Sequence, residues 1–237
     1  EDFYKHPNVN YIKIDASSSI LTPGSARNVL LKEFYQTNQD FGIFADNDAI
    51  VYEQAQHKMG HRFIEDFNKT HDYSDIDFIW PINPGIIPFN KKFNSDPDLY
   101  NNNQVFKKTT NAKGSFMILK NIKKQNNLEI YFDETFNKND GTFIPEEERD
   151  FVLNFIKHGL GTYVFENLIL KEFGANGASS TWMPDVAKRN VYKSEVGKIL
   201  QKKYGDFITV DDLGKLNTNK FVKQYFKKPP LVVIPVQ

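Results

Sequence analysis

The sequence predicts an α/β protein, in which strands and helices alternate along the chain. Three observations support this fold class. An apolar run, Phe41–Ala45, has the length of a buried strand and delivers acidic residues at its end. A second strand, Val9–Asp15, precedes it, and a glycine-containing loop and a helical pattern lie between the two. A chain of 237 residues suits one α/β domain, or one domain with an appendage.

The composition is that of an ordinary globular protein, with 40% hydrophobic and 25% charged residues. The net charge is zero, so no global field attracts a polyanionic partner. No stretch reaches the roughly 18 apolar residues of a membrane span, and we expect none. The absence of cysteine excludes disulfides and thiolate metal sites. It fits a reducing compartment, and we therefore expect a cytoplasmic location.

The spacing of apolar residues predicts the elements of the first part of the chain. Recurrence every three or four positions indicates a helix, and short apolar runs indicate buried strands. Helices are predicted over residues 29–39, 53–68 and 146–158, and strands over 77–81, 116–119 and 162–170. The polar, asparagine-rich stretch 90–112 predicts a surface loop.

The character of the chain changes after Phe173. Residues 174–180 have the composition of a flexible connector, and helices are predicted over 188–204 and 218–226. The tail 231–236 is apolar enough to pack on the main body or to add an edge strand. We therefore expect a main domain over residues 1–173 and an extension, 174–237, that packs on it.

The acidic tripeptide Asp46-Asn47-Asp48 directly follows the strand Phe41–Ala45. In open α/β sheets, ligands bind at the carboxyl ends of the strands. Two carboxylates there suit a Mg²⁺ or Mn²⁺ ion that holds a diphosphate. Asp48 is the better ligand because it lies farther out from the strand. An ordinary polar turn is the alternative, since Asp and Asn are common turn residues.

A series of short motifs, in this order, resembles the GT-A glycosyltransferases of the family-2 type. These are nucleotide-sugar transferases with one Rossmann-like catalytic domain, and the resemblance covers residues 8–172. The motifs are Ala26-Arg27-Asn28, the Asp-x-Asp at 46–48, Lys113-Gly114-Ser115, Phe132-Asp133-Glu134, and Glu147-Glu148 with Asp150-Phe151. The resemblance implies a mixed sheet flanked by helices, with a small C-terminal helical extension. In that family an earlier strand and helix cradle the nucleotide base; we expect this chain to lack them.

The resemblance also implies roles in binding the nucleotide-sugar donor. It assigns Asp46 to the ribose or sugar and Asp48 to the metal, with Asp46 as a second metal ligand. Arg27 and Asn28 orient the donor, and Asp15, at the end of its own strand, reaches the ribose. A guanidinium near a helix N-terminus suits a phosphate. An exposed helix arginine is the alternative for Arg27.

The catalytic candidates are Glu148 and Glu147, which match the acidic pair of the family. We expect Glu148 to be the base that deprotonates the acceptor hydroxyl, in an inverting, single displacement. The family usually has aspartate at this position. The alternative is structural, because acidic residues after Pro145 are also typical of an ordinary helix N-terminus.

The acceptor side corresponds to Lys113-Gly114-Ser115 in the resemblance, where glycine allows the backbone to approach the sugar. Trp182 and Trp80 are candidates for stacking on a sugar ring, and core positions are the alternative for both. The third metal ligand has no clear candidate; Glu166 and Glu172 qualify by position only.

The extension around Ser180-Thr181-Trp182 and Lys203-Tyr204 loosely resembles phage and viral glycosyltransferases, which implies a location in the host cytoplasm. Some of these modify hydroxymethylated DNA bases and others build surface glycans, so both acceptors stay open. For DNA, six basic side chains would contact phosphate: Lys188, Arg189, Lys193, Lys198, Lys202 and Lys203.

Two further classes remain open from the sequence. A nucleotidyltransferase shares a Rossmann-like core and paired carboxylates. A non-catalytic carbohydrate-binding module could be built on the same fold after loss of activity.

Overall fold

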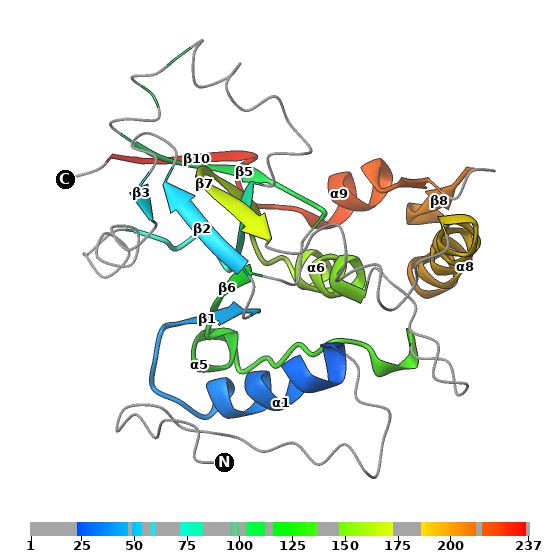
Figure 1. Cartoon of the computed structure of the whole chain (residues 1–237), viewed down its shortest axis with the longest axis horizontal. Helices are drawn as coiled ribbons and strands as arrows, with labels where there is room; N and C mark the ends of the chain where they lie inside the picture. The colour runs from blue at the N-terminus through cyan, green and yellow to red at the C-terminus, as the bar shows by residue number, and fades with distance from the viewer. Residues whose placement is uncertain are drawn as a thin grey trace.

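The computed structural model describes residues 23–46, 49–53, 58–59, 72–82, 96, 99, 103–111, 116–136, 147–172, 186–211 and 215–235. Over these ranges the chain forms a mixed β-sheet with helices packed against it (Figure 1). The predicted α/β class is therefore confirmed.

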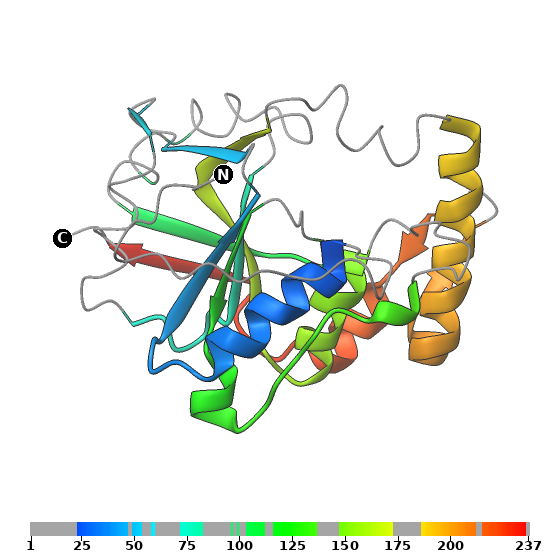
Figure 2. The ribbon, with the colours of Figure 1, turned by 60° about the horizontal axis from the view of Figure 1, so that its bottom comes forward.

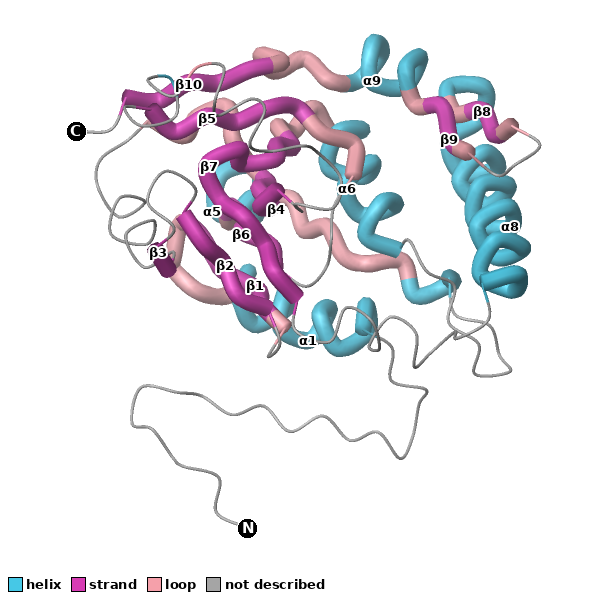
Figure 3. The backbone as a smooth tube through the Cα atoms, turned by 45° about the horizontal axis from the view of Figure 1, so that its top comes forward, coloured by secondary structure: helices cyan, strands magenta, loops and turns pink. Residues whose placement is uncertain are grey.

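The main sheet has eight strands among the described residues. One series of paired strands is β1 (Phe41–Ala45), β6 (Phe116–Lys120), β4 (Phe78–Ile82), β7 (Thr162–Glu172), β5 (Asn103–Lys108) and β10 (Leu231–Pro235). Only β4 and β7 pair in parallel; the other neighbours in this series are antiparallel. β2 (Ala49–Glu53) pairs with the second half of β7 and with β3 (Lys58–Met59). Figure 3 shows the strands side by side from β10 to β1.

The strand directions bring three carboxyl ends to one edge of the sheet. β6 is antiparallel to both β1 and β4, so β1 and β4 run the same way, and β7 runs with β4. Residues that follow β1 therefore lie at the edge where ligands bind in open α/β sheets.

Two helices, α1 (Pro23–Tyr35) and α6 (Glu147–Lys157), cover one face of the sheet (Figure 2). The shorter α5 (Ile122–Asn126) follows β6 directly. At one end of the molecule lie α8 (Val186–Tyr204) and α9 (Asn219–Tyr225). Short elements complete the set: η1 (Glu134–Phe136), η2 (Gly205–Phe207), β8 (Thr209–Val210) and β9 (Leu216–Asn217).

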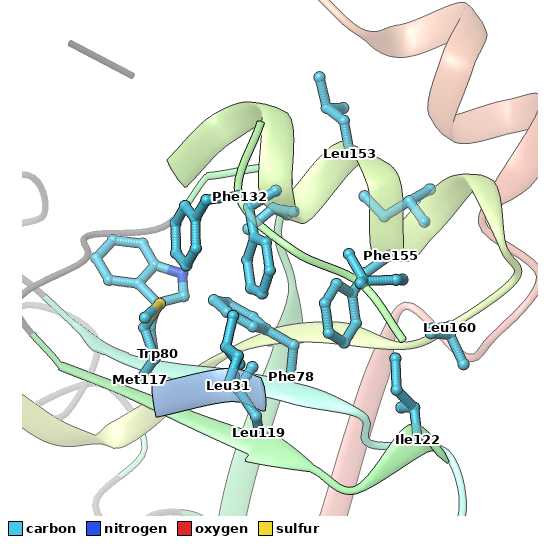
Figure 4. Packing of buried hydrophobic residues seen from close by; sticks show 14 of the residues in the cluster. Leu31, Phe78, Trp80, Met117, Leu119, Ile122, Phe132, Leu153, Phe155 and Leu160 are labelled. Carbon is cyan, nitrogen blue, oxygen red and sulfur yellow. The ribbon is translucent and has the colours of Figure 1, made fainter. Parts of the chain in front are cut away.

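The core follows from the alternation of side chains along the central strands. Phe78 and Leu119 point to the helix face, where they pack with Phe151 and Phe155 of α6 (Figure 4). The intervening residues, such as Ile79 and Ile118, belong to a second cluster on the other face. Because both faces are buried, the central strands are apolar almost throughout.

Side chains of α8 and α9 belong to the same cluster as those of α1 and α6: Val196, Leu200, Tyr204 and Phe221 are all buried there. The tail forms β10, an added strand on β5. The predicted division at residue 173 lies outside the described residues and stays a prediction.

Most predicted elements are confirmed to within a few residues, and three are wrong. The helix predicted over 53–68 conflicts with strand β2 and with β3, whose backbone pairs in a ladder with β2. The loop predicted over 90–112 contains β5, with Val105 and Phe106 buried. Its asparagines are local turn signals, and pairing with β7 and β10 overrides them. Finally, α1 begins at Pro23 and not at 29, so Arg27 lies one turn inside the helix.

Gly161 occupies a position on the sheet where the backbone leaves no room for a side chain. Its N–H donates to Asp77 Oδ2 at 2.7 Å, and its carbonyl accepts from the amides of Asp77 and Phe78. An added Cβ would lie 1.9 Å from the carbonyl oxygen of Asp75. The glycine is therefore required by the close approach of two backbone segments.

We expect Gly161→Ala to lower the free energy of unfolding by at least about 2 kcal/mol, because backbone must shift to admit the methyl group. The measurement is urea denaturation followed by circular dichroism. Gly159→Ala is the matched control: no atom lies within 4 Å of its added Cβ, and its φ of +76° imposes only the backbone strain. A loss at Gly161 no larger than at Gly159 would contradict the steric argument.

Candidate active site

Arg27 contacts three carboxyl groups that lie far from it in the sequence: that of Asp46 and those of the adjacent Glu147 and Glu148. Its Nη1 donates to Glu147 Oε1 at 3.5 Å and to Glu148 Oε1 at 3.3 Å. Its Nη2 donates to Asp46 Oδ2 at 3.4 Å. The structure thus brings together four of the residues that the sequence singles out.

The elements explain why these side chains meet. Asp46 directly follows β1, so it stands at the sheet edge where the carboxyl ends of β1 and β4 lie. Glu147 and Glu148 occupy the first turn of α6, where the helix dipole favours negative charge. Arg27 reaches both from α1, and its side chain is 11% exposed.

Glu147 is the most buried of the three carboxyl groups, with its side chain 2% exposed. Burial, aided by the nearby Glu148 carboxylate, raises the pKa of Glu147 to about 8, although the Arg27 charge acts in the opposite direction. The backbone N–H of Gly24 donates to the same carboxyl group. A Cβ at Gly24 would lie 2.4 Å from Glu147 Oε2, so glycine is what allows α1 to begin against this side chain.

Glu148 and Asp46 face outward from the same cluster. The side chain of Glu148 is 24% exposed and that of Asp46 is 47% exposed. Both can therefore contact a ligand, while Glu147 lies behind them. At neutral pH the buried Glu147 holds its proton, because its pKa is about 8. Glu148 is therefore an accessible carboxylate, and Glu147 is a buried acid.

Asn28, the neighbour of Arg27, uses its amide group to hold the segment 131–136. Its Nδ2 donates to the carbonyl of Phe132 at 3.0 Å and to Glu134 Oε1 at 2.8 Å, and its Oδ1 accepts from the Phe132 amide at 2.7 Å. The Phe132 ring stacks on Phe151 with centroids 4.1 Å apart, and the Arg27 guanidinium lies 5.7 Å above it. Asn28 thus fixes the backbone of Phe132, the residue whose ring lies under the Arg27 guanidinium.

A second charged cluster lies next to the first and was not anticipated from the sequence. Lys203 Nζ donates to Asp133 Oδ2 at 2.7 Å and to Asp150 Oδ2 at 2.8 Å. The Tyr204 hydroxyl donates to Asp150 Oδ1 at 2.8 Å. Burial raises the pKa of Asp150, and the bonds from Lys203 and Tyr204 only partly offset it. With both its oxygens bonded, Asp150 is a structural carboxyl group.

The spacing of charged residues along α8 is that of a solvated basic face. It therefore does not predict the ion pairs of Lys203 with Asp133 and Asp150. Lys203, one of the six basic side chains expected to contact phosphate if DNA is the acceptor, forms ion pairs with Asp133 and Asp150. Lys198 and Lys202 are exposed.

Several predicted site residues lie outside the described residues: Asp15, Asp48, Lys113, Gly114, Ser115 and Trp182. Trp80, a candidate for stacking on a sugar, is buried in the core at 6% exposure. Its indole Nε1 finds no hydrogen-bond partner among the described residues, and Figure 4 shows this nitrogen on the side of Phe132. Its ring faces are not available to a ligand. Glu166 is likewise buried, on β7.

No group of three or more metal-ligating side chains occurs within the described ranges. Mg²⁺ in phosphate-binding sites is commonly held by one or two carboxylates together with substrate phosphates and water. Asp46, exposed at the strand end, could be one of these carboxylate ligands. Among the described residues, no helix has the length and apolar character needed to cross a membrane.

An open hollow of about 480 Å³ adjoins the site between α1 and the segment 131–134. Asn28, Lys32, Tyr131, Asp133 and Glu134 line it. A ligand in this hollow would meet polar groups and two aromatic residues, Tyr131 and Phe132.

Comparison with known proteins gives no match to this chain among protein-family models, curated proteins or solved structures.

Proposed function

We propose that this chain is a metal-dependent glycosyltransferase of the GT-A type, which moves a hexosyl or pentosyl group from a nucleotide-sugar donor to an acceptor hydroxyl. One observation carries the proposal: Arg27 lies within 3.5 Å of carboxylate oxygens from the end of β1 and from the first turn of α6. These are the segments that the resemblance assigns to donor binding and to catalysis. Arg27 and Glu148 are 121 residues apart in the sequence, so local structure alone does not bring them together.

The proposed reaction is a single displacement. The acceptor oxygen forms a bond to the anomeric carbon of the sugar while its proton passes to Glu148. The bond between that carbon and the diphosphate oxygen breaks, and the electron pair leaves with the nucleoside diphosphate. With Glu148 as the base, a single displacement needs no second carboxylate as a nucleophile, and it inverts the configuration at the anomeric carbon.

The departing diphosphate requires positive charge. Mn²⁺ or Mg²⁺, held by Asp46 and Asp48 together with the phosphate oxygens, would neutralise it as a Lewis acid. Arg27 contacts three carboxyl groups at distances of 3.3–3.5 Å. Such long contacts are weaker than short, bidentate pairs, so Arg27 can exchange one of them for a phosphate oxygen.

The acceptor stays open between a glycan and a hydroxymethylated DNA base. The two differ in salt dependence, because DNA binding through several lysines weakens steeply as salt rises. Acceptor binding that is insensitive to salt would exclude DNA.

The test is a thermal-shift screen of nucleotide sugars, with and without Mn²⁺. Because a ligand that binds only the folded state stabilises it, the true donor at 100 times its Kd is expected to raise Tm by about 5 °C or more. The shift should require the metal. The screen also includes nucleoside triphosphates, whose preference over every nucleotide sugar would favour a nucleotidyltransferase.

Turnover of the selected donor then separates an enzyme from a binding module. Release of nucleoside diphosphate should depend on Mn²⁺ and be abolished by Asp48→Ala. Asp40→Ala is the control: Asp40 immediately precedes β1, forms an exposed ion pair with Lys124, and lies at the opposite end of that strand. Donor binding without any turnover would leave the non-catalytic carbohydrate-binding module as the better description.

A further inference from the structure

We propose that Lys203, at the end of α8, is a positioning residue of the candidate active site. It holds the segment 131–136 and the first turns of α6 in the arrangement that brings Arg27 to Glu147 and Glu148. The site therefore depends on a residue of the C-terminal extension. This inference rests on the proposed function for the meaning of the site, while the contacts that carry it are independent of that function.

The first contact connects Lys203 to the segment that lies under Arg27. Lys203 Nζ lies 2.7 Å from Asp133 Oδ2, and the other oxygen of Asp133 accepts from the amide and the hydroxyl of Thr135. Although partial burial alone would raise the pKa of Asp133, the bonds from Lys203 and Thr135 bring it below its ordinary value. The adjacent Phe132 lies beneath the Arg27 guanidinium.

The second contact leads from Lys203 to the catalytic candidates. Lys203 Nζ lies 2.8 Å from Asp150 Oδ2, and the side chain of Asp150 is 1% exposed. Asp150 is three residues after Glu147 on α6, so the two side chains stand one above the other on the helix. A buried carboxyl group that loses its cationic partner is strongly destabilised, so we expect loss of Lys203 to disturb the first turns of α6.

The two residues that Lys203 contacts are the sequence neighbours of two stacked aromatic rings. Phe132, next to Asp133, stacks on Phe151, next to Asp150, with an interplanar angle of 1°. Lys203 thus bridges the two charged residues beside this stack. The bridge holds the segment 131–136 against α6, and Asn28 in turn binds the same segment from α1.

The test measures local order without requiring any activity. Amide hydrogen exchange is followed in the wild type and in Lys203→Met, which keeps the length of the side chain and removes its charge. We expect the amides of Phe132, Thr135 and Phe136 to exchange at least about tenfold faster in Lys203→Met. Lys203→Arg should restore most of the protection. Lys220→Met, a loss of one exposed charge elsewhere in the extension, should leave these rates unchanged.

Asp133→Asn breaks the same ion pair from the other side and leaves Lys203 on Asp150. It should increase exchange at the same amides, and it decides the question if Lys203→Met does not fold. An increase spread evenly over the whole chain, or none at the segment 131–136, overturns the proposal.

Turnover provides the functional arm. Where the wild type transfers sugar, Lys203→Met is expected to lower kcat/KM about tenfold, with recovery in Lys203→Arg, because a misplacement of about 1 Å is enough for a loss of this size. An unchanged kcat/KM overturns the positioning role. If the wild type turns over no nucleotide sugar, the proposed function fails, and the exchange rates still decide whether Lys203 holds the segment.

Discussion

Glu148→Gln is expected to reduce the rate of sugar transfer by a factor of about 10²–10⁴ while leaving the donor affinity within about twofold. Glutamine keeps an oxygen that can accept from Arg27, so the geometry at 3.3 Å is preserved. It cannot accept the proton of the acceptor hydroxyl. The loss should therefore appear in kcat, measured with saturating donor, and not in the Kd for the donor measured by calorimetry.

Glu147→Gln is the matched comparison, since the two residues are adjacent and both contact Arg27. Glu147 is 2% exposed and holds its proton at neutral pH because its pKa is about 8. A buried, protonated group is neither reachable nor basic, so we expect a loss of about tenfold or less. A much larger loss at Glu147 than at Glu148 would reverse the two roles.

The contribution of Glu147 to the free energy of unfolding is expected to decrease as pH rises from 4.5 to about 8. The unfolded chain releases this proton near the ordinary value of 4.5, and the folded chain releases it near 8. Below the lower value both states are protonated and the full stabilisation is present. As pH rises through the folded value that stabilisation is lost, with a total on the order of a few kcal/mol.

Glu147→Gln isolates this contribution, because glutamine has the shape of the protonated acid and does not titrate. Urea denaturation at a series of pH values should show the variant gaining stability relative to the wild type from pH 4.5 to about 8, then levelling off. Glu33→Gln, an exposed change on α1 that also removes one carboxyl group, is the control, and an equal gain in this variant would show that the effect is not specific to Glu147. A constant difference between Glu147→Gln and the wild type would show that burial does not perturb this group.

Much of the fold could be predicted because its signals are local. The helix 147–157 has an apolar spacing that matches its period, and the strand Phe41–Ala45 is an uninterrupted apolar run. Both lie where the sequence indicated, although the strand was expected to be buried and only its Phe44 is. β5 was missed because its polar, asparagine-rich sequence resembles a loop; its pairing with β7 and β10 is a long-range property.

For the candidate site, the amino-acid sequence alone was sufficient to select Arg27, Asp46, Glu147 and Glu148, since motif order and residue type are readable from the chain. It could not show that Glu147 is buried while Glu148 is partly exposed, nor detect that Lys203 and Tyr204 support Asp150. Those properties depend on burial and on charges that approach from residues far away in the sequence. Only packing of α1 and α8 against α6 creates them, because desolvation and Coulomb interactions act through space and leave no local periodicity in the sequence.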